Sequence, residues 1–312
     1  MTPKPEDAPR DEPMRGIPLL LSAIALFSIS DALAKHLGET LPPVEIAWLR
    51  YLAFFTLAAI PLLRPGGAAL LVSRAPGLQV LRGLGVVGSA VVFIVALRFL
   101  PLAEATAINF VSPAFVTVLS VIFLGERVGW RRWSAIAVGM VGMLIIVRPG
   151  AEAFRPEALL PMLSSAAWAS AVIVTRRMGT LDHPATTLFW TAATGFLVLT
   201  LVLPFGVTVP DARQVAIGLL IGVVSSAAQW LVVLAYRAAP ASVLAPFSYV
   251  QLVFSGLLGL LVFGTVPDRW TLMGAAVIAA SGLYMAHRER VRSRAARMTA
   301  AADPLPGAQG KR

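Results

Sequence analysis

Ten apolar runs of similar length dominate this sequence and restrict the fold more than any other feature. A helix needs about 20 apolar residues to cross the hydrocarbon core of a bilayer, and each run is about that long. Lipid offers no partner to backbone N–H and C=O groups, so each run must be helical. We therefore predict an all-α polytopic membrane protein with ten transmembrane helices. The runs cover residues 16–37, 44–63, 78–99, 102–123, 132–148, 157–178, 185–204, 214–236, 241–263 and 270–286.

The composition excludes several other protein classes. Apolar residues make up 57% of the chain and charged residues only 13%, with a mean hydropathy of +0.78. An average soluble domain is about half apolar and a quarter charged, so a disordered chain, a coiled coil and an ordinary soluble enzyme are excluded. The net charge is +10. Because the basic residues gather in the C-terminal tail, we expect them to face anionic lipid, and we expect no nucleic-acid partner.

Both ends of the chain are polar tails. Residues 1–15 are rich in Pro and acid and predict a disordered tail, and residues 288–312 predict a basic one. Ala32-Leu33-Ala34 is similar to a signal-peptide cleavage site, but the run is long and follows an acidic segment, so we expect a retained helix. Most of the 26 Lys and Arg residues fall on the side that both termini share. The positive-inside rule then predicts cytoplasmic termini in a bacterial inner (plasma) membrane.

The second half of the sequence repeats the first. An offset of 139 residues aligns Arg98 with Arg237, Pro101 with Pro240 and Gly125 with Gly264, an offset of 140 aligns Trp130 with Trp270, and an offset of 141 aligns Lys35 with Arg176. Each unit has five helices, and an odd number makes the second copy enter the membrane from the opposite side. Inverted repeats are typical of secondary transporters, with a binding site between the halves near mid-membrane. The predicted repeats are 16–148 and 157–287, with a linker at 149–156.

The chain resembles the EamA-type ten-helix members of the drug/metabolite transporter superfamily over residues 16–287. The residues that carry the likeness are Phe27-Ser28-Ile29-Ser30-Asp31-Ala32-Leu33-Ala34-Lys35, Leu97-Arg98-Phe99-Leu100-Pro101-Leu102-Ala103-Glu104-Ala105 and Phe123-Leu124-Gly125-Glu126-Arg127-Val128-Gly129-Trp130. Members of this family export amino acids or other metabolites, or import compounds such as S-adenosylmethionine or riboflavin. The resemblance implies transport of a small molecule. The second copy has Gly264-Thr265 where Gly-Glu often stands, which predicts a lost salt bridge.

The sequence offers little for catalysis, a metal or a cofactor. Cysteine is absent, and His36, His183 and His287 are too far apart to suggest a metal site. Gly83-Leu84-Gly85-Val86-Val87-Gly88 matches a dinucleotide fingerprint, but it lies inside one predicted helix instead of after a strand. We interpret these glycines, and Gly218 with Gly222, as close contacts between membrane helices. No Ser-His-Asp set, intramembrane carboxylate pair or P-loop occurs, so we expect neither an enzyme nor an ATP-driven pump.

Asp31 is the acidic residue that lies well inside a predicted span. A carboxylate in hydrocarbon is costly, so it should face the bundle interior and have a partner. Lys35 is four residues on along the same helix face. Arg50 and Asn109 should lie at a similar depth, with Glu45 and Glu104 at the rim. This group predicts either a binding and proton-coupling cluster or a structural ion pair that sets helix register.

Aromatic and amide side chains form a second group in the later spans. Its members are Trp168, Trp190, Gln229, Trp230, Phe247, Tyr249 and Gln251. Stacking against a flat or apolar solute is one interpretation, and core packing is the other. Pro113 and Pro246 free backbone carbonyls within two spans, which predicts either moving broken helices or tolerated kinks.

These patterns together predict a secondary transporter of a small amphipathic metabolite such as an amino acid, nucleoside-like or vitamin-like solute. The predicted substrate-binding residues are Asp31, Arg50, Asn109, Trp168, Gln229, Trp230 and Tyr249, and the predicted gating or coupling residues are Lys35, Glu104, Pro113 and Pro246. We expect no cofactor, and the partners are the substrate, the lipid bilayer and a candidate coupling proton. Alternatives are a membrane-embedded transferase built on the rim group of Glu45, Glu104 and Lys35, and a lipid flippase or carrier subunit. Nothing in these patterns selects the substrate, the direction of transport, the coupling ion or the oligomeric state.

Overall fold

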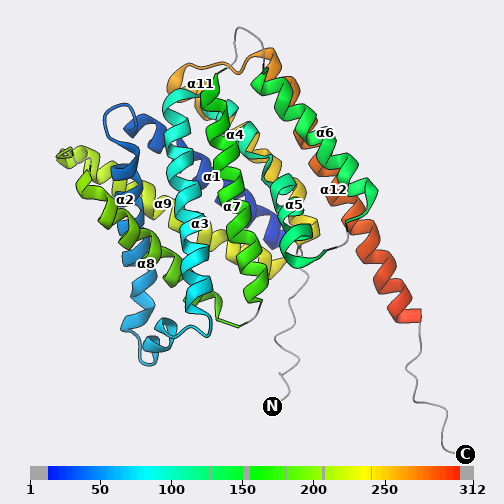
Figure 1. The fold of residues 1–312 in the computed structure, drawn as a ribbon, viewed down its shortest axis with the longest axis horizontal. Helices are drawn as coiled ribbons and strands as arrows, with labels where there is room; N and C mark the ends of the chain where they lie inside the picture. Colours follow the sequence, from blue (N-terminus) through cyan, green and yellow to red (C-terminus); the bar gives the residue numbers. More distant parts are fainter. Residues whose placement is uncertain are drawn as a thin grey trace, which may run out of the picture.

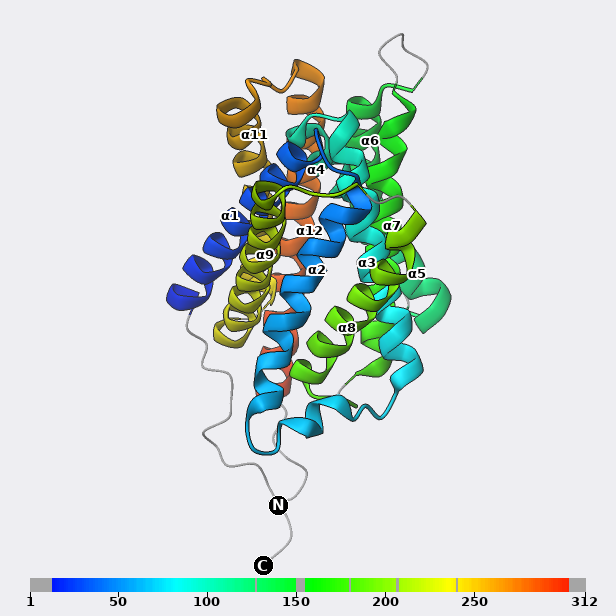
Figure 2. The same cartoon turned by 90° about the vertical axis from the view of Figure 1, so that its left-hand side faces the viewer.

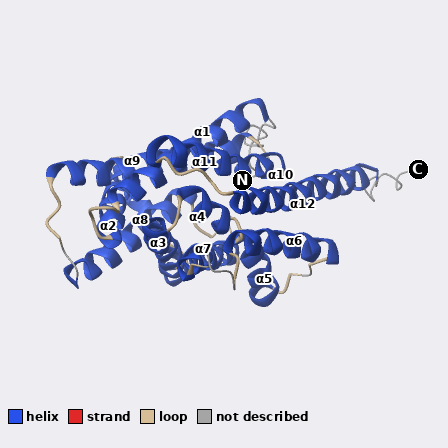
Figure 3. Cartoon of the chain, turned by 90° about the horizontal axis from the view of Figure 1, so that it is seen from above, coloured by secondary structure: helices blue, strands red, loops and turns tan. Residues whose placement is uncertain are grey.

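The structure is a computed structural model that describes residues 13–126, 128–149, 155–179, 181–205, 208–239 and 241–302. Over these residues the chain is helical, without strands (Figure 3). The α-helices are α1 (Pro13–Leu37), α2 (Pro43–Ala59), α3 (Pro76–Phe99), α4 (Leu102–Asn109), α5 (Ser112–Leu124), α6 (Trp130–Val147), α7 (Leu159–Met178), α8 (Pro184–Val202), α9 (Ala212–Ala238), α10 (Ala241–Leu244), α11 (Val250–Phe263) and α12 (Arg269–Ala302). Short 3₁₀ segments are η2 (Ile60–Leu63), η3 (Gly67–Leu71), η4 (Pro156–Ala158), η5 (Leu203–Phe205) and η6 (Ala245–Tyr249).

In this part of the chain, eight helices are long and apolar enough to cross a membrane. They span Met14–Leu37, Pro43–Leu63, Pro76–Phe99, Leu102–Leu124, Pro156–Met178, Pro184–Val202, Ala212–Tyr236 and Pro246–Phe263. The other two predicted spans are α6, with the shorter apolar stretch Trp133–Val147, and the first part of α12. These two helices pack side by side at one edge of the bundle (Figure 1). The fold is a polytopic helical membrane protein, as predicted.

Local sequence signals set many of the helix boundaries. Pro43, Pro76 and Pro184 each occupy the first position of a helix, where a missing N–H costs nothing and the fixed φ suits the helix. Gly125 and Gly264, which the repeat aligns, end α5 and α11 with φ values of 65° and 62°. Because this left-handed conformation strains residues that carry a Cβ, glycine is the residue expected at both positions.

The two repeats run in opposite directions through the bundle. We call the end at which α1 begins and α12 ends the near end, and the opposite end the far end. Figures 1 and 2 show α1 rising from the near end while α7, the first long helix of the second repeat, descends from the far end. The halves interlock along three pairs of helices, α1 with α9, α3 with α7 and α2 with α8. This arrangement surrounds the centre of the bundle with helices from both repeats.

Two predicted spans are broken near mid-bundle. The span that contains Pro113 divides into α4 and α5, and the span that contains Pro246 divides into α10, η6 and α11. Phe110 and Tyr249, which the offset of 139 aligns, lie at these two breaks with ring centroids 5.1 Å apart. Equivalent residues of two repeats can contact each other only near the axis that relates the repeats. The two broken helices therefore meet at the centre of the fold.

Of the predicted tails 1–15 and 288–312 and the linker 149–156, residues 1–12, 303–312 and 150–154 lie outside the described residues, and the second tail is helical as far as Ala302. α1 begins at Pro13 and α12 continues to Ala302. Gly83 and Gly85 lie within α3, where Cβ atoms would crowd Thr194 of α8 and Ala171 of α7. Gly218 and Gly222 similarly let α9 approach α2. The predicted role in close helix contact is confirmed for these four glycines, whereas a Cβ at Gly88 would meet no atom within 4 Å.

Candidate functional site

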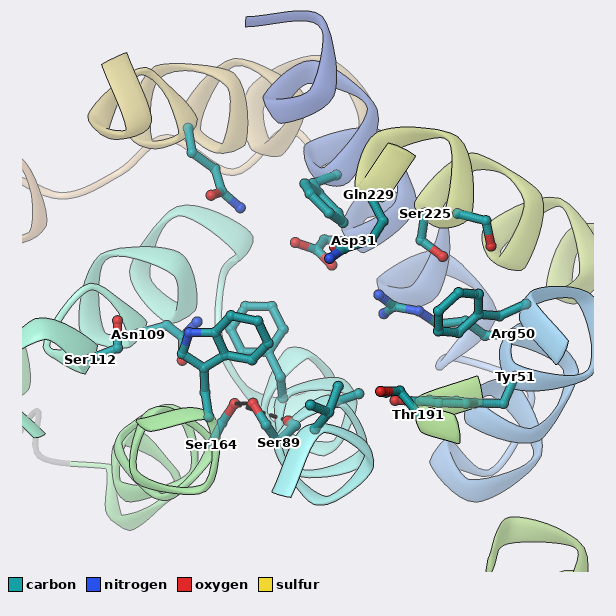
Figure 4. Close-up of a pocket in the computed structure, with 18 of the residues that line it drawn as sticks. Asp31, Arg50, Tyr51, Ser89, Asn109, Ser112, Ser164, Thr191, Ser225 and Gln229 are labelled. Atoms are coloured by element: carbon teal, nitrogen blue, oxygen red, sulfur yellow. Dashed lines mark hydrogen bonds between the residues drawn. The ribbon is translucent and has the colours of Figure 1, made fainter. Parts of the chain in front are cut away.

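A cavity of about 340 Å³ lies between the two repeats at mid-bundle. A ligand pocket for a small organic molecule typically encloses about 300–1,000 Å³, so this cavity lies in that range. α1, α2, α3, α4 and the start of α5 line it from the first repeat, and α7, α8, α9 and α11 from the second. Figure 4 shows polar side chains converging on it from several helices. Its lining is Phe27, Asp31, Arg50, Tyr51, Phe54, Arg82, Val86, Ser89, Ala90, Phe93, Thr106, Asn109, Phe110, Ser112, Ser164, Trp168, Leu188, Thr191, Ser225, Ser226, Gln229 and Gln251.

The structure brings together five of the seven residues predicted to bind substrate. Asp31, Arg50, Asn109, Trp168 and Gln229 all line the cavity. The other two lie elsewhere. The side chain of Trp230 is 57% exposed on the outer face of α9.

Tyr249 is the seventh predicted residue, and it lines a smaller adjoining pocket instead of the main cavity. That pocket lies between the broken helices and the α6–α12 pair, and its residues include Pro113 and Gly282. A Cβ at Gly282 would collide with the Tyr249 hydroxyl. Tyr249 therefore packs between Phe110 and the backbone of α12.

Asp31 and Arg50 face each other across the cavity. In Figure 4 the guanidinium of Arg50 points toward Asp31, and the side chain of Gln229 lies beside the carboxylate. The two charges are close enough to interact electrostatically. Among the described residues, neither makes a hydrogen bond or an ion pair within 4 Å. Buried polar groups normally have hydrogen-bond partners. A structural ion pair would have its two side chains bonded to each other, whereas Asp31 and Arg50 are not. Both side chains can therefore still form hydrogen bonds with a molecule in the cavity.

Lys35 does not pair with Asp31, although the two share a helix face. Its ammonium donates to the backbone carbonyls of Leu97 at 2.6 Å and Leu100 at 2.8 Å. It also lies 5.5 Å from the centre of the Phe263 ring. Carbonyls in the last turn of a helix have no partner within that helix, so Lys35 satisfies the far end of α3. Lys35 thus ties α1, α3 and α11 together at the far end.

Arg82 is a cavity residue that was not among the predicted site residues. It lies in the second turn of α3, and its side chain reaches the second repeat. The guanidinium donates to the hydroxyl of Thr175 at 2.8 Å and also to the hydroxyl of Thr191. A basic residue close to a helix start usually reaches the membrane interface, and only the neighbouring helices show that this one points inward. The sequence did hold one indication that Arg82 lies inside the bundle, because it falls within the predicted span 78–99, six residues after Pro76.

Hydroxyl groups join the repeats on one wall of the cavity. The Ser89 and Ser164 hydroxyls lie 3.0 Å apart, and Ser164 also donates to the Ser89 carbonyl at 2.9 Å. Ser165 donates to the backbone carbonyl of Asn109 at 2.9 Å and lies 3.0 Å from its side-chain oxygen. These bonds leave the side-chain amide N–H groups of Asn109 free to meet a solute (Figure 4).

Aromatic rings line the cavity from equivalent positions of the two repeats. The offset of 141 that aligns Lys35 with Arg176 also aligns Phe27 with Trp168, and both line the cavity. Trp168 is 42% exposed. A large aromatic ring that is not enclosed by its own protein can stack on a flat or apolar solute.

Two charge clusters lie outside the spans, one at each end. At the far end, the Arg148 guanidinium contacts the Asp268 carboxylate at 2.7 Å, which joins α6 to the start of α12. Asp268 also accepts the backbone N–H of Thr271 at 2.7 Å and so caps α12. Partial burial acts to raise the pKa of Asp268, but the bonds from Thr271 and Arg148 outweigh it and lower the pKa. The predicted gating residue Glu104 lies near this cluster, within electrostatic range of Arg155, Asp268 and Arg148.

At the near end, Asp182 accepts hydrogen bonds from three groups. They are the Ser73 hydroxyl, the Arg74 backbone N–H at 2.8 Å and the Gln79 amide at 2.7 Å. The bond from Ser73, followed by those from Arg74 and Gln79, lowers the pKa of Asp182. Asp182 therefore holds the loop before α3 against the loop before α8.

The three residues of the rim group behind the transferase alternative have separate partners. Glu45 accepts the Thr208 hydroxyl at 2.8 Å, Lys35 is bonded to the end of α3, and Glu104 faces the Arg148–Asp268 cluster. Within the described residues, no group of three or more His, Cys, Asp or Glu side chains is placed to hold a metal ion.

Known proteins resemble this chain along most of its length. A riboflavin transporter of Rhizobium johnstonii is 31% identical over 88% of this chain and 92% of the relative. A pseudopaline exporter of Pseudomonas aeruginosa is 31% identical over 88% and 97%. An S-adenosylmethionine uptake transporter of Rickettsia prowazekii is 27% identical over 89% and 94%.

A solved crystal structure matches the fold with a TM-score of 0.60 at 22% sequence identity, over 88% of this chain and 98% of that one. This likeness concerns the fold alone. Residues 14–148 and 155–286 each match the EamA-like transporter family, one match to each half of the chain. With two family matches that together cover nearly the whole bundle, the chain belongs to the EamA-like transporter family of multi-span membrane proteins.

Proposed function

We propose that the protein is a secondary active transporter that carries a small amphipathic metabolite across the bacterial inner membrane by alternating access. The observation that carries the proposal is the mid-bundle cavity in which Asp31 and Arg50 face each other without a direct bond. The relatives support a small solute, since their names specify S-adenosylmethionine, riboflavin and pseudopaline. These are three different molecules, so the choice among solutes has to come from the cavity.

An asymmetry between the two ends supports alternating access. At the far end, α4 of the first repeat packs against α11 of the second. The offset of 139 makes α10 and η6 the equivalents of α4, and α5 the equivalent of α11. Among the described residues, α5 makes no comparable packing with α10 or η6. Figure 3 shows α5 and α10 on opposite sides of the α6–α12 pair. We infer that the far end is closed and the near end is the open one.

Lys35 and its repeat equivalent, Arg176, make different bonds at the two ends of the bundle. Lys35 is bonded to carbonyls of its own repeat at the closed far end. Arg176 instead contacts Glu126 of the other repeat at 3.1 Å. In the opposite state the repeats would exchange conformations. Arg176 would then reach the carbonyls of Tyr236 and Ala239, which are the equivalents of Leu97 and Leu100. Repeats that exchange conformations in this way expose one site to each side in turn.

We further propose that both termini are cytoplasmic, so that the near end faces the cytoplasm, and that the repeats divide at 16–148 and 157–287. Asp31 is the candidate coupling group, because a carboxylate facing a central cavity can exchange a proton with water from either side. In this mechanism Asp31 and Arg50 hold the polar part of the solute, Asn109 and Gln229 hydrogen-bond to it, and Trp168 stacks on it.

The test uses purified protein in proteoliposomes loaded with a bacterial metabolite extract. We expect at least one metabolite to exchange across the membrane without nucleotide, as measured by mass spectrometry of the external medium. Asp31→Asn and Trp168→Ala should reduce the initial rate at least tenfold. Trp230→Ala is the matched control, because it removes the same ring from the outer face, and it should exchange at close to the wild-type rate. Wild-type rates in both cavity variants would overturn the site, and the absence of any exchange would overturn the function.

A further inference from the structure

The charges that line the cavity are unbalanced, and they all come from the first repeat. Asp31, Arg50 and Arg82 are the charged residues of its lining. At the offset of 141, the second repeat has Val172 in place of Asp31 and Thr191 in place of Arg50. The aromatic pair of Phe27 and Trp168 follows the internal symmetry, whereas the charges do not. Helix packing common to both repeats therefore does not explain them.

Arg82 lacks a carboxylate partner in the described part of the chain. Its guanidinium is bonded to two hydroxyls, those of Thr175 and Thr191, and the Tyr51 phenol is the titratable group near enough to interact with it. A cation buried in a membrane protein without a counter-ion is costly. A guanidinium has five N–H donors, so Arg82 retains donors beyond those that its two hydroxyl partners accept. An anionic group of a ligand that enters the cavity would supply the counter-charge that Arg82 lacks.

Arg50 lies on the same side of the cavity as Thr191, the hydroxyl partner of Arg82 (Figure 4). Asp31 lies beside Gln229, and the guanidinium of Arg50 points toward Asp31 (Figure 4). The cavity thus presents one acidic group and two guanidinium groups. Guanidinium groups bind carboxylates in a bidentate geometry, and a carboxylate binds an ammonium group.

We propose that the transported solute is an amino acid-like molecule with one amine, two carboxylate groups and a flat unsaturated body. This inference rests on the proposed function. Asp31 binds the amine, Arg50 and Arg82 bind the carboxylates, and Phe27 and Trp168 pack on the body. With Asp31 ionised, the lining carries one net positive charge and the solute one net negative charge, so the loaded cavity is neutral. A solute with a net positive charge is rejected, because it would add an unpaired charge inside a low-dielectric cavity.

The experiment compares ligands on one skeleton: N-(carboxymethyl)-L-phenylalanine, L-phenylalanine and phenethylamine. They carry net charges of minus one, zero and plus one at neutral pH. Binding to the detergent-purified protein is measured by calorimetry. We expect N-(carboxymethyl)-L-phenylalanine to bind at least tenfold more tightly than L-phenylalanine, and phenethylamine to bind weakest. Arg82→Gln should remove the difference between the first two. Arg98→Gln is the matched control, because Arg98 is exposed and lies outside the cavity lining, and it should keep the difference.

A second variant keeps the test decisive if Arg82→Gln does not fold. Benzylsuccinate has two carboxylates and no amine, and we expect the wild-type protein to bind it at least tenfold less tightly than N-(carboxymethyl)-L-phenylalanine. Asp31→Asn removes the group that recognises the amine and leaves two positive charges in the lining, so this variant should bind benzylsuccinate at least as tightly as N-(carboxymethyl)-L-phenylalanine. The proposal is overturned if phenethylamine binds as tightly as the dicarboxylate, if none of the compounds binds at millimolar concentration, or if Asp31→Asn leaves the amine preference unchanged.

Failure of this inference is distinguishable from failure of the proposed function. If proteoliposomes exchange a metabolite with a net positive charge, the proposed transport function is supported and the proposed substrate class is refuted. If the binding series behaves as expected but no metabolite exchanges, the proposed ligand chemistry of the cavity is supported and the proposed transport function is refuted.

Discussion

Replacing Lys35 by methionine should open the far end of the bundle. Lys35 makes two charged hydrogen bonds to the carboxyl end of α3, at 2.6 and 2.8 Å, and lies over the Phe263 ring. A hydrogen bond that involves a charged group contributes about 1.5–3 kcal/mol, and a cation–π contact about 0.5–2 kcal/mol. These contributions are not additive, and in the open state the Lys35 ammonium regains some of its hydrogen bonds from water. We therefore expect a net loss of about 2–3 kcal/mol from the state closed at the far end, which is roughly a 30- to 150-fold shift toward the state open at that end.

The pseudo-equivalent residue provides an internal comparison. Arg176 and Glu126 at the near end are 42% and 38% exposed. An exposed ion pair contributes about 0–1 kcal/mol, so Arg176→Met should change the equilibrium at most about fivefold. Lys35→Arg keeps a cation in place and should behave like the parent protein.

The absence of cysteine makes the assay straightforward. Ala90 lines the cavity from α3, and Ala90→Cys places one thiol there. With the near end facing the cytoplasm, as proposed above, a membrane-impermeant maleimide added to intact cells reaches the cavity only when the far end opens. We expect slow labelling in the parent and at least tenfold faster labelling after Lys35→Met. Unchanged labelling in a Lys35→Met protein that keeps the parent's melting temperature would refute the assignment of the closed end.

Three further predictions concern stability in detergent, measured by thermal unfolding. A Cβ at Gly142 would lie 2.9 Å from the Gly274 carbonyl oxygen, so Gly142→Ala should destabilise the protein by about 1–3 kcal/mol through overpacking; an unchanged melting temperature would contradict the close approach of α6 and α12. Asp268→Ala should cost about 1–2 kcal/mol through the lost cap of α12, more than Arg148→Gln, which loses only a partly exposed ion pair; equal effects would argue against the cap. Hydrogen bonds lower the pKa of Asp182 below its ordinary value of 3.8, so its contribution is present above that pH and is lost as the pH falls below it. Asp182→Asn should flatten the decline of the melting temperature below about pH 4, and a decline as steep as that of the wild type would refute this role.

Depth within the membrane could be predicted for the binding residues, but the direction of each side chain could not. Asp31, Arg50 and Asn109 were placed at a common depth from helix rise, and all three line one cavity. Trp168 and Trp230 looked equivalent in the sequence, since both lie deep within a span. The first lines the cavity and the second faces outward. Only the neighbouring helices determine which face of a nearly uniformly apolar helix points inward.

The sequence alone determined the positions of the spans, the internal repeat and its inversion. An apolar run long enough to cross the bilayer must form a helix, because lipid offers its backbone groups no hydrogen-bond partner. An odd number of crossings in the first repeat makes the second repeat enter the membrane from the opposite side. Tertiary structure alone decided that Lys35 binds carbonyls instead of Asp31, that Arg82 turns into the cavity and that one end of the bundle is packed more tightly than the other. These outcomes depend on contacts between helices far apart in the chain, and periodicity within one helix carries no record of them.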